Sequence, residues 1–433
     1  MDSLTKFYGK IVAFADKATV EKQYSLGATM IAKGYHHKLS DINAAIEYCK
    51  KHGADVAELA YEIANISKAV CDAEAGEPSG YLAKIDTKQS GISIQSMITR
   101  DGVAMQTLGF LDNTNSDLYM MFVEAFGNKV SRKTMKKVVI PRFYGSVAAI
   151  KRILGEENFD KFCAMYARLL PKCDQLRQAM LDAWDDKATE YTWTLPDHAQ
   201  VVTPVQELFV RKEYDEDGFI TNDDHSETQM IEWVNSKGVR KHCYVYYPKK
   251  GALEKGEDGT RALGANVIHS LDAYLMRELI TRCANAVKYS LKFESLKHSK
   301  KLDSIAGLEH IKANELMQCW KDTGIVSLRV MDYLKHGDVL PDDYYYAVKE
   351  AVNHLPKHHF DVVAVHDEFM CHINYVDEMQ KAFNYLMVEL YKGHFLEYIA
   401  KMLNWEAKGL KIEIDSVNPE IVEAIANSTY LLQ

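Results

Sequence analysis

The chain of 433 residues is 47% hydrophobic, which is enough apolar material for a large core spread over two or three lobes. Its formal net charge of -9 excludes a protein that grips nucleic acid over its whole surface, so any such contact has to be local. The sequence has no secretory signal, no apolar run near the ~20 residues that span a bilayer, and no cysteines at metal-ligand spacing, which favours a cytosolic protein with reduced thiols.

The first 75 residues are predicted to be helical. Apolar side chains recur at helical spacing from Ile42 to Cys49, with Ser40 as a candidate N-cap and Gly53 as a stop. A second helix is expected to begin near Val56. Helices therefore precede the first strand.

A strand is expected next, followed by more helix. Residues 76–80 read Gly-Glu-Pro-Ser-Gly, which breaks the helical pattern, and the apolar run from Tyr81 to Ile85 is typical of a strand. This strand would place Asp86 at its end. Helices are expected to resume from about Gly91.

A short basic helix is predicted after Ser131, which is a plausible N-cap. Arg132 and Lys136 would lie one turn apart on one face, where both could pair with a triphosphate. Tyr144 and Gly145 would close the helix, because glycine accepts a left-handed backbone there. The alternatives are a solvated basic face and a core tyrosine. The basic residues gathered here are Lys129, Arg132, Lys133, Lys136, Lys137 and Arg142.

The rest of the chain alternates between helices and short strands. Residues 145–185 keep helical periodicity, residues 191–195 and 201–202 suggest strands, and a polar hairpin is expected through Asp217-Gly218. Helices return from Val267. Residues 360–373 read as one β-hairpin whose tip is His366-Asp367-Glu368. The predicted class is α+β, mostly helical, with a small antiparallel sheet.

Asp86 and Asp367 both stand at predicted strand ends although they are far apart in sequence. Carboxylates in such places suit two-metal phosphoryl or nucleotidyl transfer, in which hard oxygen ligands hold magnesium. Either aspartate alone is usually a turn residue or a helix cap. The hypothesis depends on both occurring with the basic helix between them.

Several motifs, in order along the chain, resemble those of the single-subunit RNA polymerases of bacteriophages and mitochondria. The segment from Asp86 to Asp101, with Ser90, Gly91 and Arg100, resembles motif A. Two further segments are similar to family stretches: residues 193–197 and residues 266–272, the latter with Arg277 in register. The residues that resemble motifs B and C are Arg132, Lys136, Tyr144, Gly145 and Ser146, and then His366 and Asp367.

The resemblance implies a right-hand polymerase palm with helical fingers and two Mg²⁺ ions held by Asp86 and Asp367. It also implies nucleotide-binding residues, with Lys136 as a candidate proton donor to pyrophosphate and His366 beside the primer-terminal phosphate. A tyrosine hydroxyl and a histidine could recognise the ribose 2′-hydroxyl, which both donates and accepts hydrogen bonds. The nucleotide-binding set would be Arg132, Lys136, Tyr144, Gly145 and His269.

The sequence departs from the family pattern in three places. Glu368 stands where the RNA polymerases usually have serine. A glutamate at this place is the form seen in the related family A DNA polymerases. Ser90-Gly91 and His269 nevertheless match the RNA polymerases. Pro141 should kink the basic helix near Lys137. The third departure is a long insertion at 286–359. A family A-like DNA polymerase, or a catalytically dead scaffold of polymerase shape, remains the alternative.

The resemblance implies a division of the chain and a set of partners. The expected partners are a DNA template, an RNA product, ribonucleoside triphosphates and an accessory DNA-binding factor, in the cytoplasm of an infected bacterial host. The short region before motif A resembles the larger subunit of heterodimeric phage RNA polymerases, so a second subunit would carry the thumb and the amino-terminal region. The expected divisions are a helical region at 1–75, a palm part at 76–110, fingers at 111–265, a helix at 266–285, an insertion at 286–359, and the palm hairpin with a foot at 360–433.

Overall fold

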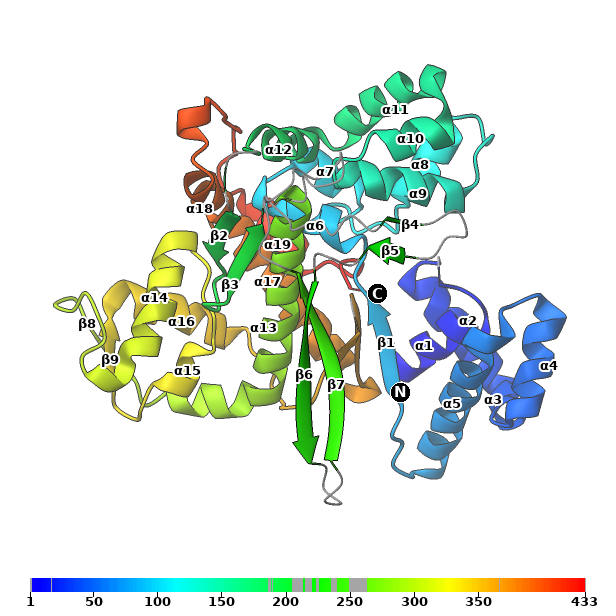
Figure 1. Cartoon of the computed structure of the whole chain (residues 1–433). Helices are drawn as coiled ribbons and strands as arrows, with labels where there is room; N and C mark the ends of the chain where they lie inside the picture. The colour runs from blue at the N-terminus through cyan, green and yellow to red at the C-terminus, as the bar shows by residue number, and fades with distance from the viewer. Residues whose placement is uncertain are drawn as a thin grey trace.

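The computed structural model describes residues 2–16, 18–185, 188, 190–204, 213–214, 220–222, 226–234, 240–248, 263–365 and 367–432. The protein is mostly helical, with small sheets set among the helices (Figure 1). The predicted α+β, mostly helical class is therefore confirmed. None of the helices in these ranges combines the length and apolar content that a bilayer crossing requires.

The amino-terminal part is helical, as predicted. Asp41, one residue after the expected Ser40, caps the fourth helix by accepting a hydrogen bond from the Ala44 backbone N–H, and Gly53 ends that helix with a left-handed backbone. The helices are α1 (Asp2–Val12), α2 (Val20–Ala32), α3 (Tyr35–Leu39), α4 (Ile42–His52) and α5 (Val56–Ala75).

Two glycines allow α1 and α2 to touch backbone to backbone. A Cβ added at Gly9 would lie 1.8 Å from the Gln23 carbonyl oxygen, and one added at Gly27 would lie 1.9 Å from the Thr5 carbonyl oxygen. No larger residue fits either position without separating the helices.

A three-stranded antiparallel sheet lies at the centre of the molecule (Figure 1). Its strand order is β1 (Leu82–Asp86), β11 (Glu368–His372) and β10 (Val363–Val365). Alternate residues of β1 are buried, with Ala83 and Ile85 at 0% exposure. The register pairs Asp86 with Glu368, so the ends of two strands far apart in sequence meet.

Between β1 and the next strands the chain is helical, again as predicted. The seven helices described over residues 90–182 are α6 (Ser90–Ile98), α7 (Gly102–Thr107), α8 (Leu118–Ala125), α9 (Arg132–Phe143), α10 (Ala148–Leu154), α11 (Glu156–Leu169) and α12 (Pro171–Asp182).

Three two-stranded antiparallel sheets follow, and the first contains the two strands predicted near residues 191–195 and 201–202. The tip of the expected hairpin at Asp217-Gly218 lies outside the described residues. The strands are β2 (Glu190–Thr194), β3 (Gln200–Pro204), β4 (Glu213–Tyr214), β5 (Ile220–Asn222), β6 (Ser226–Val234) and β7 (Arg240–Pro248).

The long helix α13 (Leu263–Phe293) packs against α6 and the helix α17 and crosses the expected divisions at 265/266 and 285/286 without a break. The sheet of β8 and β9 is parallel, whereas the other four described sheets are antiparallel. The elements after α13, apart from β10 and β11, are β8 (Lys297–Ser299), η1 (Leu308–His310), α14 (Ile311–Thr323), α15 (Val330–Tyr333), β9 (Val339–Pro341), α16 (Asp342–Asn353), η2 (Ile373–Tyr375), α17 (Val376–Lys392), α18 (Phe395–Met402), η3 (Glu406–Lys408) and α19 (Pro419–Ala426).

A buried ion-pair network joins α13 to α17. Arg282, 2% exposed, donates from Nε to Glu278 Oε1 at 3.0 Å, and its NH2 lies 2.7 Å from Glu389 Oε2. Ser327 and the Leu328 backbone N–H donate to the Glu278 carboxylate. The network therefore also fixes the position of the loop before α15.

Candidate functional site

A cleft of about 1530 Å³ opens beside the central sheet. Its walls come from α1, α5, β1, α6, α8, α9, α13 and β11, elements that span most of the chain (Figure 1). Six of the eight candidate catalytic and nucleotide-binding residues line this one cleft: Asp86, Arg132, Lys136, Tyr144, His269 and Asp367.

The two aspartates reach the cleft from neighbouring strand ends. Asp86 is the last residue of β1, and Asp367 lies in the turn between β10 and β11. Thr87 fixes the turn, because its backbone N–H and Oγ1 donate to the Asp367 carbonyl oxygen at 3.0 and 3.1 Å. The acidic hairpin tip predicted from the sequence therefore lies beside Asp86.

Negative charge gathers where the strand ends meet. Partial desolvation first, and then the charges of Asp367 and Glu368, raise the pKa of Asp86 to about 6. Lys84 lies 3.9 Å from Glu368 and offsets part of this charge. Among the described residues these carboxylates do not form a group of three at ligand spacing. Such a site suits magnesium, which keeps several waters and takes one or two carboxylates.

The helix α9 presents the predicted basic pair to the cleft. Ser131 caps it by accepting from the Thr134 backbone N–H at 3.1 Å, which confirms the predicted helix start. Lys136 is exposed and forms no ion pair with any described residue. Arg132 instead donates from Nε to Asp117 Oδ2 at 2.6 Å and lies over the Tyr119 ring. A triphosphate would have to share Arg132 with Asp117.

Tyr144 and His269 form a polar pair across the cleft wall. The Tyr144 hydroxyl oxygen lies 2.8 Å from His269 Nε2, and the rings meet edge to face at 5.0 Å between centroids. Burial, Asp272 and Asp367 raise the pKa of Tyr144, so its hydroxyl keeps its proton at neutral pH. The structure therefore brings together two residues from α9 and α13 that the sequence separates by 125 positions.

Two residues of α6 support this pair. Ser90 Oγ donates to Asp272 Oδ1 at 2.5 Å, which links α6 to α13 one turn beyond His269. A Cβ added at Gly91 would lie 2.8 Å from the Phe143 ring, next to Tyr144. Because Gly91 has no side chain, α6 and the end of α9 can approach each other.

Gly145 lies behind the cleft rather than in its lining. Its φ of 93° is the left-handed conformation predicted for the helix end, and an added Cβ would lie 3.1 Å from Leu181. Its contribution is to the shape of the turn after Tyr144. His366 lies outside the described residues.

The two other segments of the resemblance contact each other. Trp193 Nε1 donates to Ser270 Oγ at 3.1 Å, and Arg277 forms a two-pronged pair with the buried Asp197 at 2.6 and 3.1 Å. These residues hold β2 and its turn against α13. They position His269 without lining the cleft themselves.

Arg100 and Asp101, quoted with motif A, have structural partners. The Arg100 guanidinium donates to carbonyl oxygens at the carboxyl end of α17, including that of Tyr391 at 2.9 Å. Asp101 accepts from the Ala104 backbone N–H in α7 and from the Lys172 N–H in α12. Their charges therefore pair with free backbone groups at helix ends and are not used in the cleft.

Sequence reasoning missed some cleft residues. Asp117 carries only the signal of an N-cap, which it is, since it accepts from the Tyr119 and Met120 backbone N–H groups. Glu58 and Glu62 of α5 line the opposite wall, and nothing in their spacing indicates this. Burial raises the pKa of Glu62, with Glu368 adding to the effect.

The sequence was also compared with models of known protein families and with curated proteins. Neither comparison gives a match. Assignment of a function therefore depends on the cleft itself.

Proposed function

We propose that the chain is the catalytic subunit of a DNA-directed RNA polymerase, which transfers nucleotides from ribonucleoside triphosphates to a growing RNA. The observation that carries this proposal is the meeting of Asp86 and Asp367 at adjacent strand ends, in a cleft that also contains Arg132, Lys136 and the Tyr144–His269 pair. This cleft would be the centre of a polymerase palm, with α9 as part of the fingers.

Asp86 and Asp367 would hold two Mg²⁺ ions, and the donor set fits because both side chains offer hard carboxylate oxygens to one cleft. Magnesium, when bound, activates the attacking oxygen and neutralises charge on the leaving group. Glu368, opposite Asp86 in the strand register, adds charge that favours a divalent cation at this place.

The basic side of the cleft suits the triphosphate. Lys136 carries a positive charge that no described carboxylate neutralises, and Arg132 offers a planar guanidinium held by Asp117. Both project from one face of α9. Lys136 is placed to give a proton to pyrophosphate as it leaves.

The Tyr144–His269 pair suits selection of the sugar. The hydroxyl of Tyr144 and the imidazole of His269 can together donate to and accept from a 2′-hydroxyl. Ser90 and Gly91 occupy the place where family A DNA polymerases carry the glutamate that excludes ribose, and the Ser90 hydroxyl donates to Asp272, which also lines the cleft.

A second candidate is a DNA polymerase of the family A type. Glu368 favours it, because this residue lines the cleft next to Asp367. A catalytically dead scaffold is less suited to the cleft, since a scaffold has no structural need for Lys136, Arg132, Asp86 and Asp367 to line one cleft.

The test is incorporation of labelled nucleotides on a primed DNA template by the purified chain. The proposal predicts magnesium-dependent extension with ribonucleotides and much weaker extension with deoxyribonucleotides. The opposite preference would assign the cleft to a DNA polymerase. No extension by folded protein, with and without its copurifying partners, would indicate a scaffold.

A further inference from the structure

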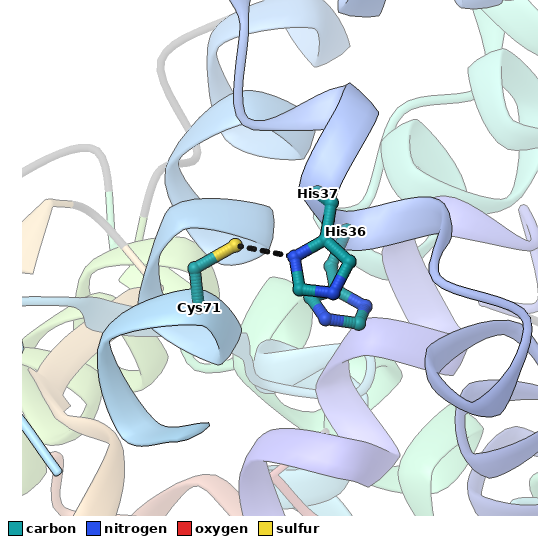
Figure 2. Close-up of side chains that lie close together, drawn as sticks. All are labelled: His36, His37 and Cys71. Carbon is teal, nitrogen blue, oxygen red and sulfur yellow. Dashed lines mark hydrogen bonds between the residues drawn. The ribbon is translucent and has the colours of Figure 1, made fainter. Parts of the chain in front are cut away.

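Away from the cleft, three potential metal ligands converge between α3 and α5. One ring nitrogen each from His36 and His37, together with Cys71 Sγ, lie within 4.8 Å of one another (Figure 2). His36 and His37 are in α3, and Cys71 is in the last turns of α5. No other group of three histidine, cysteine or carboxylate ligands in the described part of the chain is this close.

A carboxylate lies beside the two histidines, outside this group of three. Glu74 Oε2 lies 2.8 Å from His36 Nε2 and 3.9 Å from His37 Nε2, and Glu74 follows Cys71 by three positions on one face of α5. The contact at His36 Nε2 leaves Nδ1 as the ring nitrogen that a metal could take, and a carboxylate on the other nitrogen is the usual partner of a metal-binding histidine.

The contacts of these side chains with one another are incomplete without a further partner. His36 is buried at 1% exposure, yet its Nδ1 has no hydrogen-bond partner among the described residues, which is unusual for a buried polar atom. The contact from Cys71 Sγ to His37 Nδ1 is 3.8 Å, a long and weak one (Figure 2). The two imidazole rings lie 3.9 Å apart between centroids. An ion pair between His36 and Glu74 would account for those two side chains alone. It would not explain why His37 and Cys71 also lie here.

We propose that His36, His37 and Cys71 bind a zinc ion, with Glu74 orienting His36 through its other ring nitrogen. Zinc prefers imidazole nitrogen and thiolate sulfur as ligands, whereas magnesium, the metal proposed for the cleft, prefers oxygen. In a tetrahedral zinc site neighbouring ligand atoms are roughly 3.3–3.8 Å apart, so a contraction of about 1 Å would bring the three ligand atoms to that spacing and leave the fourth position to water. His37, whose side chain is 66% exposed, gives the ion a path from solvent.

Zinc at this place would stabilise the fold rather than act in the cleft. It would join α3 to the end of α5, which leads through residues 76–81 into β1 and Asp86. The side of α5 with Glu58 and Glu62 forms one wall of the cleft. Closing the loop from His36 to Cys71 would therefore hold that wall in place.

The test is the metal content and spectroscopy of the full chain. Protein purified without chelator should contain about one zinc per chain, and replacement by Co²⁺ should give the thiolate-to-cobalt charge-transfer absorption. Zinc should raise the Tm of metal-free protein. Cys71→Ala and His37→Ala should lose the metal and the absorption, and Glu74→Gln should weaken binding.

Matched controls separate the site from other thiols and imidazoles. Cys163 is a partly exposed free cysteine in α11, and His358 pairs with Glu378 at 2.7 Å. Cys163→Ala and His358→Ala should keep the zinc and the cobalt absorption. Wild-type protein that binds no more zinc than Cys71→Ala, and whose cobalt form lacks the absorption, would overturn the proposal.

Discussion

The hydroxyl of Tyr144 is held at 2.8 Å from His269 Nε2, so its position in the cleft is set by a side chain from another helix. The ring of Tyr144 packs edge to face against Phe143, which Gly91 allows to come close. A mutation can therefore remove the hydroxyl and leave the ring in place, because the ring is held by packing and the hydroxyl by a hydrogen bond.

We predict that Tyr144→Phe relaxes discrimination between ribonucleotides and deoxyribonucleotides by about tenfold or more, while much of the polymerisation rate remains. The reason is that a lost hydrogen bond to a polar group costs about 1–3 kcal/mol, and only the substrate with the 2′-hydroxyl makes it. Incorporation of matched ribo- and deoxyribonucleotides measures the ratio. Unchanged selectivity would move the role to His269 or favour the DNA polymerase alternative.

The raised pKa of Asp86, about 6 in place of 3.8, predicts a pH dependence of metal binding. The metal binds the ionised carboxylate and competes with the proton, so affinity should fall as the pH drops through 6. From pH 7 to pH 5 the ionised fraction falls from about 0.9 to about 0.1, which corresponds to roughly tenfold weaker binding.

Binding of Mn²⁺, followed by its paramagnetic resonance, is the measurement of this dependence. The Cys71→Ala variant should be used so that the α3–α5 site does not contribute. Asp86→Asn should bind more weakly and lose this part of the pH dependence. Equal affinity at pH 5 and pH 7 in the protein with Asp86 intact would contradict the account.

At the scale of elements, local signals predicted the parts that bring the site together. Three such parts could be predicted from the sequence, because each depends on residues within a few positions: the Ser131 cap, the strand that ends at Asp86 and the acidic hairpin tip at Asp367. Neither the pair of Arg132 with Asp117 nor the cluster of His36 with Cys71 could be predicted from the sequence. Each joins segments whose approach only the tertiary fold determines.

The helix α13 shows the same limit. Its start near Val267 was predicted, but not its passage through position 286 to Phe293. Glu278 and Arg282 have the spacing of an ordinary surface pair on a helix, and nothing in the sequence indicated that both are buried. Burial follows from α17 and the loop at Ser327, which arrive from later in the chain.

We predict that Arg282→Leu lowers the free energy of unfolding by about 3–5 kcal/mol, because it leaves the buried carboxylates of Glu278 and Glu389 without their cation. Denaturant unfolding measures the loss. Lys50→Met, which removes an exposed pair with Glu47, is the matched control and should change stability by less than about 1 kcal/mol. A loss of similar size in the two variants would contradict the role of the network.

At the scale of the whole molecule, charge limits what the chain can hold. The net charge is -9, and one helix beside the cleft, α9, carries the exposed Lys133, Lys136 and Lys137. A polymerase has to retain an RNA–DNA hybrid, which favours positive surface on several sides of the duplex. A second subunit could supply that surface.

We therefore predict that the purified chain makes short products on a primed template and that a second polypeptide lengthens them. The effect should grow as salt is raised, because the few basic contacts of this chain are screened first. Product length with and without the copurifying partner is the measurement. Full processive synthesis by the chain alone, with no second polypeptide detectable, would show that the partner is not required.

Asp86 and Asp367 are proposed to hold the metals for nucleotidyl transfer, and the most direct test is magnesium-dependent extension of a primed template by single variants. Asp361 supplies the control, since it precedes the same hairpin, is exposed and lies outside the cleft lining. Asp86→Asn and Asp367→Asn should each slow extension at least roughly a hundredfold with the fold intact, because each removes a charged metal ligand. Asp361→Asn should extend as the wild type does. Near-normal extension by either Asp86→Asn or Asp367→Asn would contradict the account.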